Sequence, residues 1–295
     1  MRRLAGIGAA GAGAACWGLS GTAGQLLFER GITPQWLTAV RLLLAGLLLL
    51  VVFRPAPPQR AAWRGLVGSG LGLASAQYCF FASVAASNVA VAAFIQYLSA
   101  PLIVGIEAMS GRRRPPGAIL LAALAGVLSG AALLLLGRSR GDGGLVLHVS
   151  PAGVIFGLAC AVSITIYTLV SRRPVRELGA WRTTAWASLV GAVPLLVWTP
   201  PWTVHYGGSG VQLVGLVAFV TVVGTLLGTG LYLASLSLVT AGESGVASTL
   251  EAVSAALSGF LVLGIGLSPQ QYVGGALILA AVPALTLQRG AEGPA

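Results

Sequence analysis

Glu251 is the residue whose type and position point most directly to chemistry. It lies in the middle of an apolar stretch, residues 244–267, that is long enough to cross a lipid bilayer. A carboxylate costs a few kcal/mol in such a stretch, so its presence indicates a use in binding or transport. Glu251 is predicted to bind a cationic or amine-bearing substrate or to carry a proton in exchange. The structural alternative is a protonated acid that bonds a neighbouring helix.

Arg41 is the second ionisable residue placed well inside an apolar stretch, residues 34–53. At a rise of 1.5 Å per residue it lies about 10 Å from one end of its helix, and Glu251 lies about 12 Å deep from the opposite side of the membrane. A buried guanidinium binds carboxylates or phosphates. Arg41 is therefore predicted to pair with Glu251 or to bind a substrate carboxylate. The structural alternative is that it extends its side chain to the membrane interface or helps to hold the fold.

Other polar and aromatic side chains lie near the centres of further apolar stretches. Polar groups at the membrane midplane tend to face the bundle interior or a cavity, and aromatic faces accept apolar rings or cations. About half of this set is expected to line a pocket. Together with Glu251 and Arg41, the candidate substrate-binding residues are Trp17, Gln77, Tyr78, Gln96, Tyr97, Tyr167, Trp186 and Tyr232. Glu107 and Glu243, near helix ends, are assigned structural roles.

The composition places these residues in a membrane protein. Hydrophobic residues make up 56% of the 295-residue chain and charged residues 8%, with a mean hydropathy of +0.90, whereas soluble domains carry about 25% charged residues. Ten apolar stretches of roughly helical membrane-spanning length follow one another, so no soluble domain is expected. They are residues 4–28, 34–53, 65–86, 89–109, 116–137, 151–171, 181–198, 211–238, 244–267 and 269–287.

The net charge of +10 follows from membrane topology and does not indicate nucleic-acid binding. All 17 basic residues are arginine, and in a ten-helix layout most of them fall on one side, which the positive-inside rule makes cytoplasmic. The chain is thus predicted to be a multi-pass protein of the bacterial cytoplasmic membrane with both termini inside. A signal peptide ending near Cys16 is the alternative for the N-terminus, but the apolar run continues to Phe28.

No cofactor, metal site or catalytic residue is predicted. The three cysteines, Cys16, Cys79 and Cys160, lie within apolar stretches without CxxC spacing and are interpreted as packing residues. The two histidines, His148 and His205, lie in loops without ligand spacing. The chain lacks the GxxxxGK[ST] phosphate-binding motif, so transport driven by ATP is not expected.

The two halves of the chain resemble each other. Residues 78–109 and 232–263 align without gaps so that Tyr78 falls on Tyr232, and each segment is followed by a proline that opens another helix. If each repeat holds five helices, an odd number, the second repeat crosses the membrane in the opposite direction. The predicted fold is an all-α integral membrane protein with ten transmembrane helices in two inverted five-helix repeats. The repeats are placed at residues 1–140 and 149–290.

Several of these residues carry a resemblance to a known family. They are Trp17-Gly18, Arg41, the run QYLSAPLIVGIEA at residues 96–108, and the run TLEAVSAALSGFLVLG at residues 249–264. The chain resembles the EamA-type transporters of the drug/metabolite transporter superfamily. That resemblance implies two inverted five-helix repeats and transport of small organic molecules. The chain departs from the family pattern at Ala252, where a proline is usual, and at Ile265, where a glutamate is usual.

We therefore expect a secondary transporter that works by alternating access, most consistent with export of amino acids or related compounds. An importer of a small amine or quaternary ammonium compound is the main alternative, with Trp17, Tyr97 and Tyr232 as an aromatic cage and Glu251 as the counter-charge. A membrane-embedded enzyme would need clustered acids or histidines at a membrane face, which the sequence does not show. This and a structural subunit or channel are the less favoured alternatives. The expected partners are a small-molecule substrate, the lipid bilayer and a coupling proton, but no nucleic acid, with the chain as a monomer or homodimer.

Overall fold

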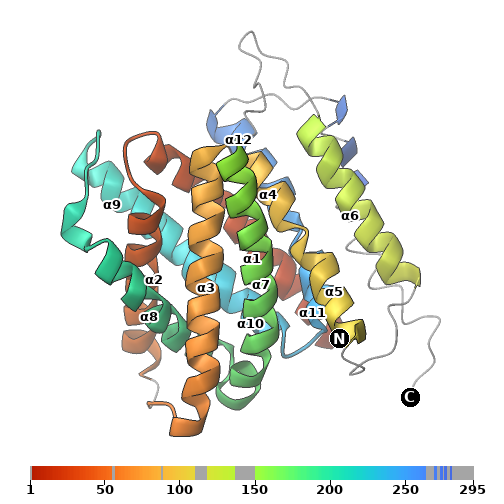
Figure 1. Ribbon diagram of the computed structural model, residues 1–295, viewed down its shortest axis with the longest axis horizontal. Coiled ribbons are helices and arrows are strands. Elements are labelled where there is room, and N and C mark those ends of the chain that lie inside the picture. Colours follow the sequence, from red (N-terminus) through yellow and green to blue (C-terminus); the bar gives the residue numbers. More distant parts are fainter. Residues whose placement is uncertain are drawn as a thin grey trace.

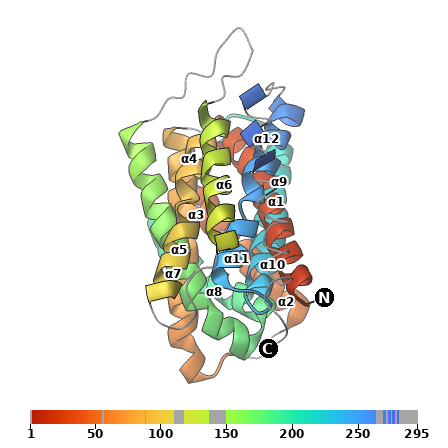
Figure 2. The same ribbon diagram turned by 90° about the vertical axis from the view of Figure 1, so that its right-hand side faces the viewer.

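The protein is a bundle of helices that run roughly along one axis, as the computed structural model shows from two sides (Figures 1 and 2). The structure describes residues 2–54, 57–87, 89–109, 118–136 and 150–263, with 269–270, 273–274, 276–277 and 280. Its described elements are all helical. Within the described ranges, three helical stretches are long and apolar enough to cross a membrane by length and composition. They are Pro34–Phe53, Pro151–Leu178 and Gly210–Ser235.

The helices of the first half are α1 (Arg2–Phe28), α2 (Pro34–Phe53), α3 (Arg60–Ala86), α4 (Val89–Gln96), α5 (Ser99–Met109) and α6 (Ala118–Leu136). The second half contains α7 (Pro151–Leu178), α8 (Ala180–Trp198), η1 (Pro201–Thr203), α9 (Gly210–Phe219), η2 (Val220–Thr229), α10 (Gly230–Ser235), α11 (Ala241–Ala247) and α12 (Leu250–Leu263). The predicted tenth span, residues 269–287, lies mostly outside the described residues, so the count of ten helices stays a prediction.

Hydrogen bonds between the helix ends fix the direction in which each helix runs. Arg3 at the start of α1 contacts Glu243 at the start of α11, so both helices begin at one end of the bundle, which we call the Arg3 end. Ser87, after α3, bonds Ser150 before α7 at the opposite end, which we call the Ser150 end. The chain reaches α7 after an odd number of crossings, so α1 and α7 begin at opposite ends of the bundle (Figure 1).

Each half of the chain packs mainly against the other half. The first helix of the first half, α1, packs along α12, η2 and α10, while the first helix of the second half, α7, packs along α3 and α4. The second helices of the two halves, α2 and α8, pack against each other. Two helix groups result, one of α1, η2, α10 and α12 and the other of α3, α4 and α7, and each contains helices from both halves.

The span predicted as one helix over residues 89–109 is interrupted at Tyr97 and Leu98. The amide of Leu98 bonds the carbonyl of Ile95, three residues back, instead of the carbonyl four residues back. Pro101, in the first turn of α5, has no backbone N–H and cannot bond the Tyr97 carbonyl. The helix therefore separates into α4 and α5.

The span predicted over residues 244–267 is also two helices, and the first begins earlier, at Ala241. The Ser248 hydroxyl donates to the carbonyl of Gly245 at 2.8 Å, and the Thr249 hydroxyl donates to the carbonyl of Val246 at 2.6 Å. Such side-chain bonds compete with the helical ladder. The break at Ser248 and Thr249 separates α11 from α12.

The two breaks correspond to each other in the two halves. Residues 97–98 and 248–249 are 151 positions apart. The sequence alignment of Tyr78 with Tyr232 gives a separation of 154 instead, so the breaks shift the predicted equivalence by three residues. In the corrected register Pro101 corresponds to Ala252, and Glu251 corresponds to Ala100. The second half therefore carries its carboxylate where the first half has a methyl group.

The predicted span 211–238 contains a stretch of π-helix, η2 (Val220–Thr229), between α9 and α10. In the α-helices, threonine hydroxyls donate to the carbonyl four residues back, as Thr165 and Thr183 do at 2.8 Å. In the wider π-helix three buried threonine hydroxyls have no partner among the described residues: Thr221, Thr225 and Thr229. The π-helix is rare, and single π-turns within α-helices are frequent at functional sites.

Two helices extend beyond their predicted spans into the arginine-rich ends. Helix α3 begins at Arg60 instead of residue 65, and α7 continues past residue 171 to Leu178. Arginine favours the helix, and Arg173 donates to Glu177 one turn on at 2.7 Å. Gly179, with a φ of 83°, ends α7. Several predicted loop arginines are therefore helical, and they lie at the Arg3 end.

Close packing of α1 on α12 generates a first prediction. A Cβ atom on Gly18 would lie 2.5 Å from the Glu251 carbonyl oxygen and 2.7 Å from the Ala255 nitrogen. Gly18→Ala should therefore destabilise the folded protein by about 1–3 kcal/mol, as overpacking typically does. Thermal unfolding in detergent measures this. Gly8→Ala on the same helix is the matched control, because nothing lies within 4 Å of its Cβ position. Equal melting temperatures would contradict the predicted close contact.

Candidate functional site

A cavity lies between the two helix groups near the middle of the bundle. Its volume is about 40 Å³, enough for a few water molecules. Seven of the ten predicted site residues line it, and they come from α1, α2, α3, α4, α7, α10 and α12. These seven are Trp17, Arg41, Gln77, Gln96, Tyr167, Tyr232 and Glu251.

Glu251 lies in the first turn of α12, directly after the helix break, and its side chain is 4% exposed. The Gln96 amide nitrogen, at the end of α4, donates to Glu251 Oε2 at 2.8 Å. The Cys160 thiol of α7 contacts Gln96 Oε1 at 3.4 Å, which orients the amide. The bond between Gln96 and Glu251 therefore lies next to both helix breaks, and it joins the two helix groups.

Arg41 is 1% exposed and does not extend to the membrane interface. Its guanidinium carbon lies 4.4 Å from the centre of the Phe81 ring, a cation–π contact. Among the described residues its Nε and Nη2 atoms have no hydrogen-bond partner, and no ion pair joins it to Glu251. The structure therefore shows neither the pair with Glu251 nor the extension to the interface. Binding of a carboxylate from outside the chain and a role in holding the fold through Phe81 both agree with this arrangement.

Aromatic residues form one wall of the cavity. The Trp17 and Tyr232 rings lie 5.1 Å apart and tilted by 46°. The Tyr232 hydroxyl is 2.8 Å from the Thr168 hydroxyl of α7, a second polar contact between the helix groups. The Trp17 Nε1 atom and the Tyr167 hydroxyl are buried without a partner in the described part of the chain. The Trp17 Nε1 atom lies against Gly228 of η2, so the wall presents mainly apolar ring surface to the cavity.

Three of the predicted site residues lie outside this cavity. Tyr97 is in the break between α4 and α5 and lines a smaller neighbouring cavity of about 10 Å³ on the side of the Arg3 end, together with Ser248. Tyr78 is turned away and packs edge-on against Phe156 and Trp198. Trp186 packs against Trp63, 5.6 Å between ring centres.

Sequence reasoning missed several residues that belong to the cavity. Phe80 and Phe81 line it, and Phe81 holds the Arg41 guanidinium, but a phenylalanine in an apolar span carries no signal that separates this role from ordinary packing. Ser20 lies one turn from Trp17 and donates to the Trp17 carbonyl at 3.0 Å. Cys160, interpreted as a packing residue, is buried as predicted and also contacts Gln96.

Comparison with known proteins identifies the family. The pattern of the EamA-like transporter family matches residues 4–136 and again residues 151–287. The chain belongs to the EamA-like transporter family. The resemblance predicted from the sequence is therefore confirmed, and the EamA chain is built from two family repeats. It is a multi-pass membrane transporter and not an enzyme.

Relatives of this EamA chain are also named as transporters. The "uncharacterized inner membrane transporter YicL" of Salmonella typhimurium is 30% identical over 283 residues, which cover 93% of this chain and 92% of the relative. The "uncharacterized transporter YwfM" of Bacillus subtilis is 29% identical over 272 residues, or 89% and 87% of the two chains. A solved crystal structure with a TM-score of 0.76 covers 99% of both chains at 20% identity, which shows a shared fold.

The bond between Gln96 and Glu251 generates the second prediction. Gln96→Met preserves side-chain length but removes the donor, so the buried carboxyl group loses its partner and stability should fall by about 1–3 kcal/mol. Replacing both residues, Gln96→Met with Glu251→Met, should recover most of that loss, because no buried polar group is then left unpaired. Melting temperatures of the two variants in detergent measure this. An unchanged Gln96→Met would show that the bond contributes nothing.

Proposed function

We propose that this EamA protein is a secondary transporter whose substrate site is the cavity between the two helix groups. One observation carries the proposal: Glu251 and Arg41, of opposite charge, both face this cavity, are both buried, and are not paired with each other. Two buried charges without each other as partners are costly in a membrane protein. A substrate with complementary charges offsets that cost.

The arrangement of the repeats supports alternating access as the mechanism. The first helices of the two halves begin at opposite ends of the bundle, which is what inverted repeats require. Transporters built from inverted repeats place the substrate near the midplane, beside broken helices, and move one bundle against the other around it. The cavity lies beside the breaks at Tyr97–Leu98 and Ser248–Thr249 and borders both helix groups.

The charges and rings of the cavity favour amino acids or related compounds as substrates. A carboxylate can accept both unpaired donors of Arg41 in the planar geometry that guanidinium favours. An ammonium group suits Glu251, and the Trp17 and Tyr232 rings suit an apolar or aromatic side chain. The alternative, import of a quaternary amine, uses the same rings, but the Arg41 cation in the same cavity disfavours a substrate that carries only positive charge.

Export of the substrate is consistent with proton antiport in which Glu251 carries the proton. A carboxylate that binds either a proton or a substrate amine couples the two, so protons entering the cell drive the substrate out. We further propose that the Arg3 end faces the cytoplasm of a bacterial cell. Arginines at the starts and ends of α1, α2, α3, α7 and α8 gather there, and only Arg30 of the described arginines lies at the Ser150 end.

Glu251→Gln tests the assignment of the site. The amide keeps the size and hydrogen bonding of the side chain but removes its charge and its proton, so transport should fall by about tenfold or more, the loss of a charge-assisted bond of about 1.5–3 kcal/mol. Counterflow into proteoliposomes, with a labelled panel of aromatic and aliphatic amino acids and choline-like amines, measures this. Glu29→Gln, an exposed acid at a helix end, is the control. A fully active Glu251→Gln protein would remove Glu251 from the site.

Arg41→Lys tests the substrate class. Lysine keeps the positive charge but loses the planar pair of donors, so exchange of acidic and zwitterionic compounds should fall by about tenfold, while neutral and cationic compounds change little. The same counterflow panel measures the ratio between substrate classes. Arg54→Lys, exposed at the end of α2, controls for the substitution itself. Equal loss for every compound would assign Arg41 a structural role.

A further inference from the structure

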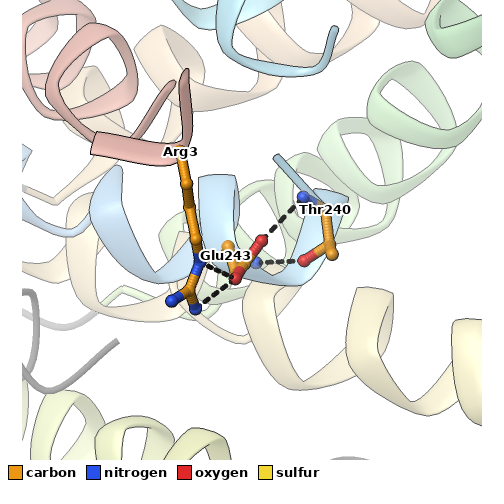
Figure 3. Close-up of polar contacts among 3 residues, drawn as sticks. All are labelled: Arg3, Thr240 and Glu243. Atoms are coloured by element: carbon orange, nitrogen blue, oxygen red, sulfur yellow. Dashed lines mark hydrogen bonds and ion pairs between the residues drawn. The ribbon is translucent and has the colours of Figure 1, made fainter. Parts of the chain in front are cut away.

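The start of α11 is held to the start of α1 by an ion pair whose residues lie 240 positions apart in the chain. The Nε and Nη2 atoms of Arg3 both donate to Glu243 Oε1, Nε at 2.8 Å. The side chains of Arg3 and Glu243 are 16% and 12% exposed. Figure 3 shows the Arg3 side chain reaching from α1 to the Glu243 carboxylate. Mostly buried pairs are screened less by salt than surface pairs.

Glu243 has a second role that is separate from the ion pair. Its other oxygen, Oε2, accepts the Thr240 backbone N–H at 2.9 Å, and the Thr240 hydroxyl accepts the Glu243 N–H at 2.9 Å, a capping box that starts α11 (Figure 3). Loss of Arg3 therefore leaves the cap in place. α11 can remain a helix when the pair to α1 is broken.

α11 is a seven-residue segment between a turn and a helix break. On its other side it packs against α5, the half-helix that follows the break in the first half. A Cβ atom on Gly245 of α11 would lie 3.6 Å from the Cα of Ala100 in α5. Both residues line the small cavity that continues from the central cavity toward the Arg3 end. The contact of α11 with α5 therefore lies between the central cavity and the Arg3 end, and we call the region that it borders the passage.

At the Ser150 end, the side-chain contacts at the start of α7 carry no charge in the described residues. There the start of α7 is joined to the end of α3 by serine bonds, Ser87 to Ser150 at 3.3 Å and Ser83 to the Gly153 carbonyl at 2.7 Å. Charge-assisted hydrogen bonds are about twice as strong as neutral ones. The start of α1 is thus held by a charged contact, and the start of α7 by neutral ones.

We propose that the Arg3–Glu243 pair is a latch that keeps the half-helix α11 against α5 and so closes the passage at the Arg3 end. When the latch opens, α11 moves as a capped unit about the break at Ser248 and Thr249 and exposes the central cavity to that end. The latch acts within the alternating access proposed above and rests on it. It assigns to Glu243 a gating role in addition to the structural one predicted from the sequence.

Cysteine labelling tests the latch without needing a substrate. The full chain, with Cys16, Cys79 and Cys160 replaced, carries Ala100→Cys in the passage at the Arg3 end and is reconstituted in proteoliposomes. Arg3→Gln or Glu243→Gln should raise the rate of maleimide labelling at position 100 by about tenfold. Glu243→Gln keeps an acceptor for the Thr240 cap. A tenfold rise in the population of the open state corresponds to about 1.4 kcal/mol. Arg2→Gln removes the same charge from the neighbouring exposed residue and should leave the rate unchanged.

A second reporter separates gating from general loosening of the fold. Ser258→Cys lies on the other side of the cavity, where Ser258 bonds Thr22 of α1 at 2.7 Å. Its labelling should stay constant or slow down in the latch variants. Unchanged labelling at position 100 in both latch variants, or faster labelling at both positions, overturns the proposal. If wild type exchanges no compound in the counterflow panel, the proposed function fails, but the labelling rates still decide the latch.

Discussion

The membrane interior makes the burial of Glu251 and Arg41 the constraint on which the architecture depends. Neither side chain reaches solvent, and each costs free energy unless the protein or a ligand supplies partners. Among the described residues, the carboxylate receives one side-chain amide, from Gln96, and the guanidinium packs on the face of Phe81. Holding these groups in one cavity requires helices from both repeats to approach closely, and Gly18 allows this where α1 crosses α12.

In the proposed mechanism, the broken helices connect this site to motion. Gln96 is the last residue of α4 and Glu251 lies directly after the break before α12, so the bond that joins the two helix groups lies at the point where both helices change course. A ligand that replaces the bond between Gln96 and Glu251, or adds to it, acts on the half-helices α4, α5, α11 and α12 together. This is the arrangement expected if substrate binding in the cavity and closure of the passage are one process.

The sequence predicted the fold well where hydrophobic pattern and caps decide it. The span 34–53 matches α2, with Thr33 as its N-cap and Pro34 at its first position, and Glu251 and Arg41 were expected near one site. The breaks were missed because they depend on bonds that pattern does not show, such as the hydroxyl of Thr249 on its own helix. The roles of Phe81 and Arg3 were missed because each depends on a partner distant in the chain.

The central claim is that the two helix groups move around the cavity so that its two ends open in turn. Distances between pairs of spin labels on the protein in lipid nanodiscs test it directly. One pair, at Arg2 and Arg176, reports on the Arg3 end, and the other, at Glu29 and Ala152, reports on the Ser150 end. All four positions are exposed and lie on α1, on α7 or in the turn after α1. As pH and the amino-acid panel are varied, the account predicts that one distance lengthens when the other shortens. Distances that stay fixed in every condition, or that lengthen together, would contradict it.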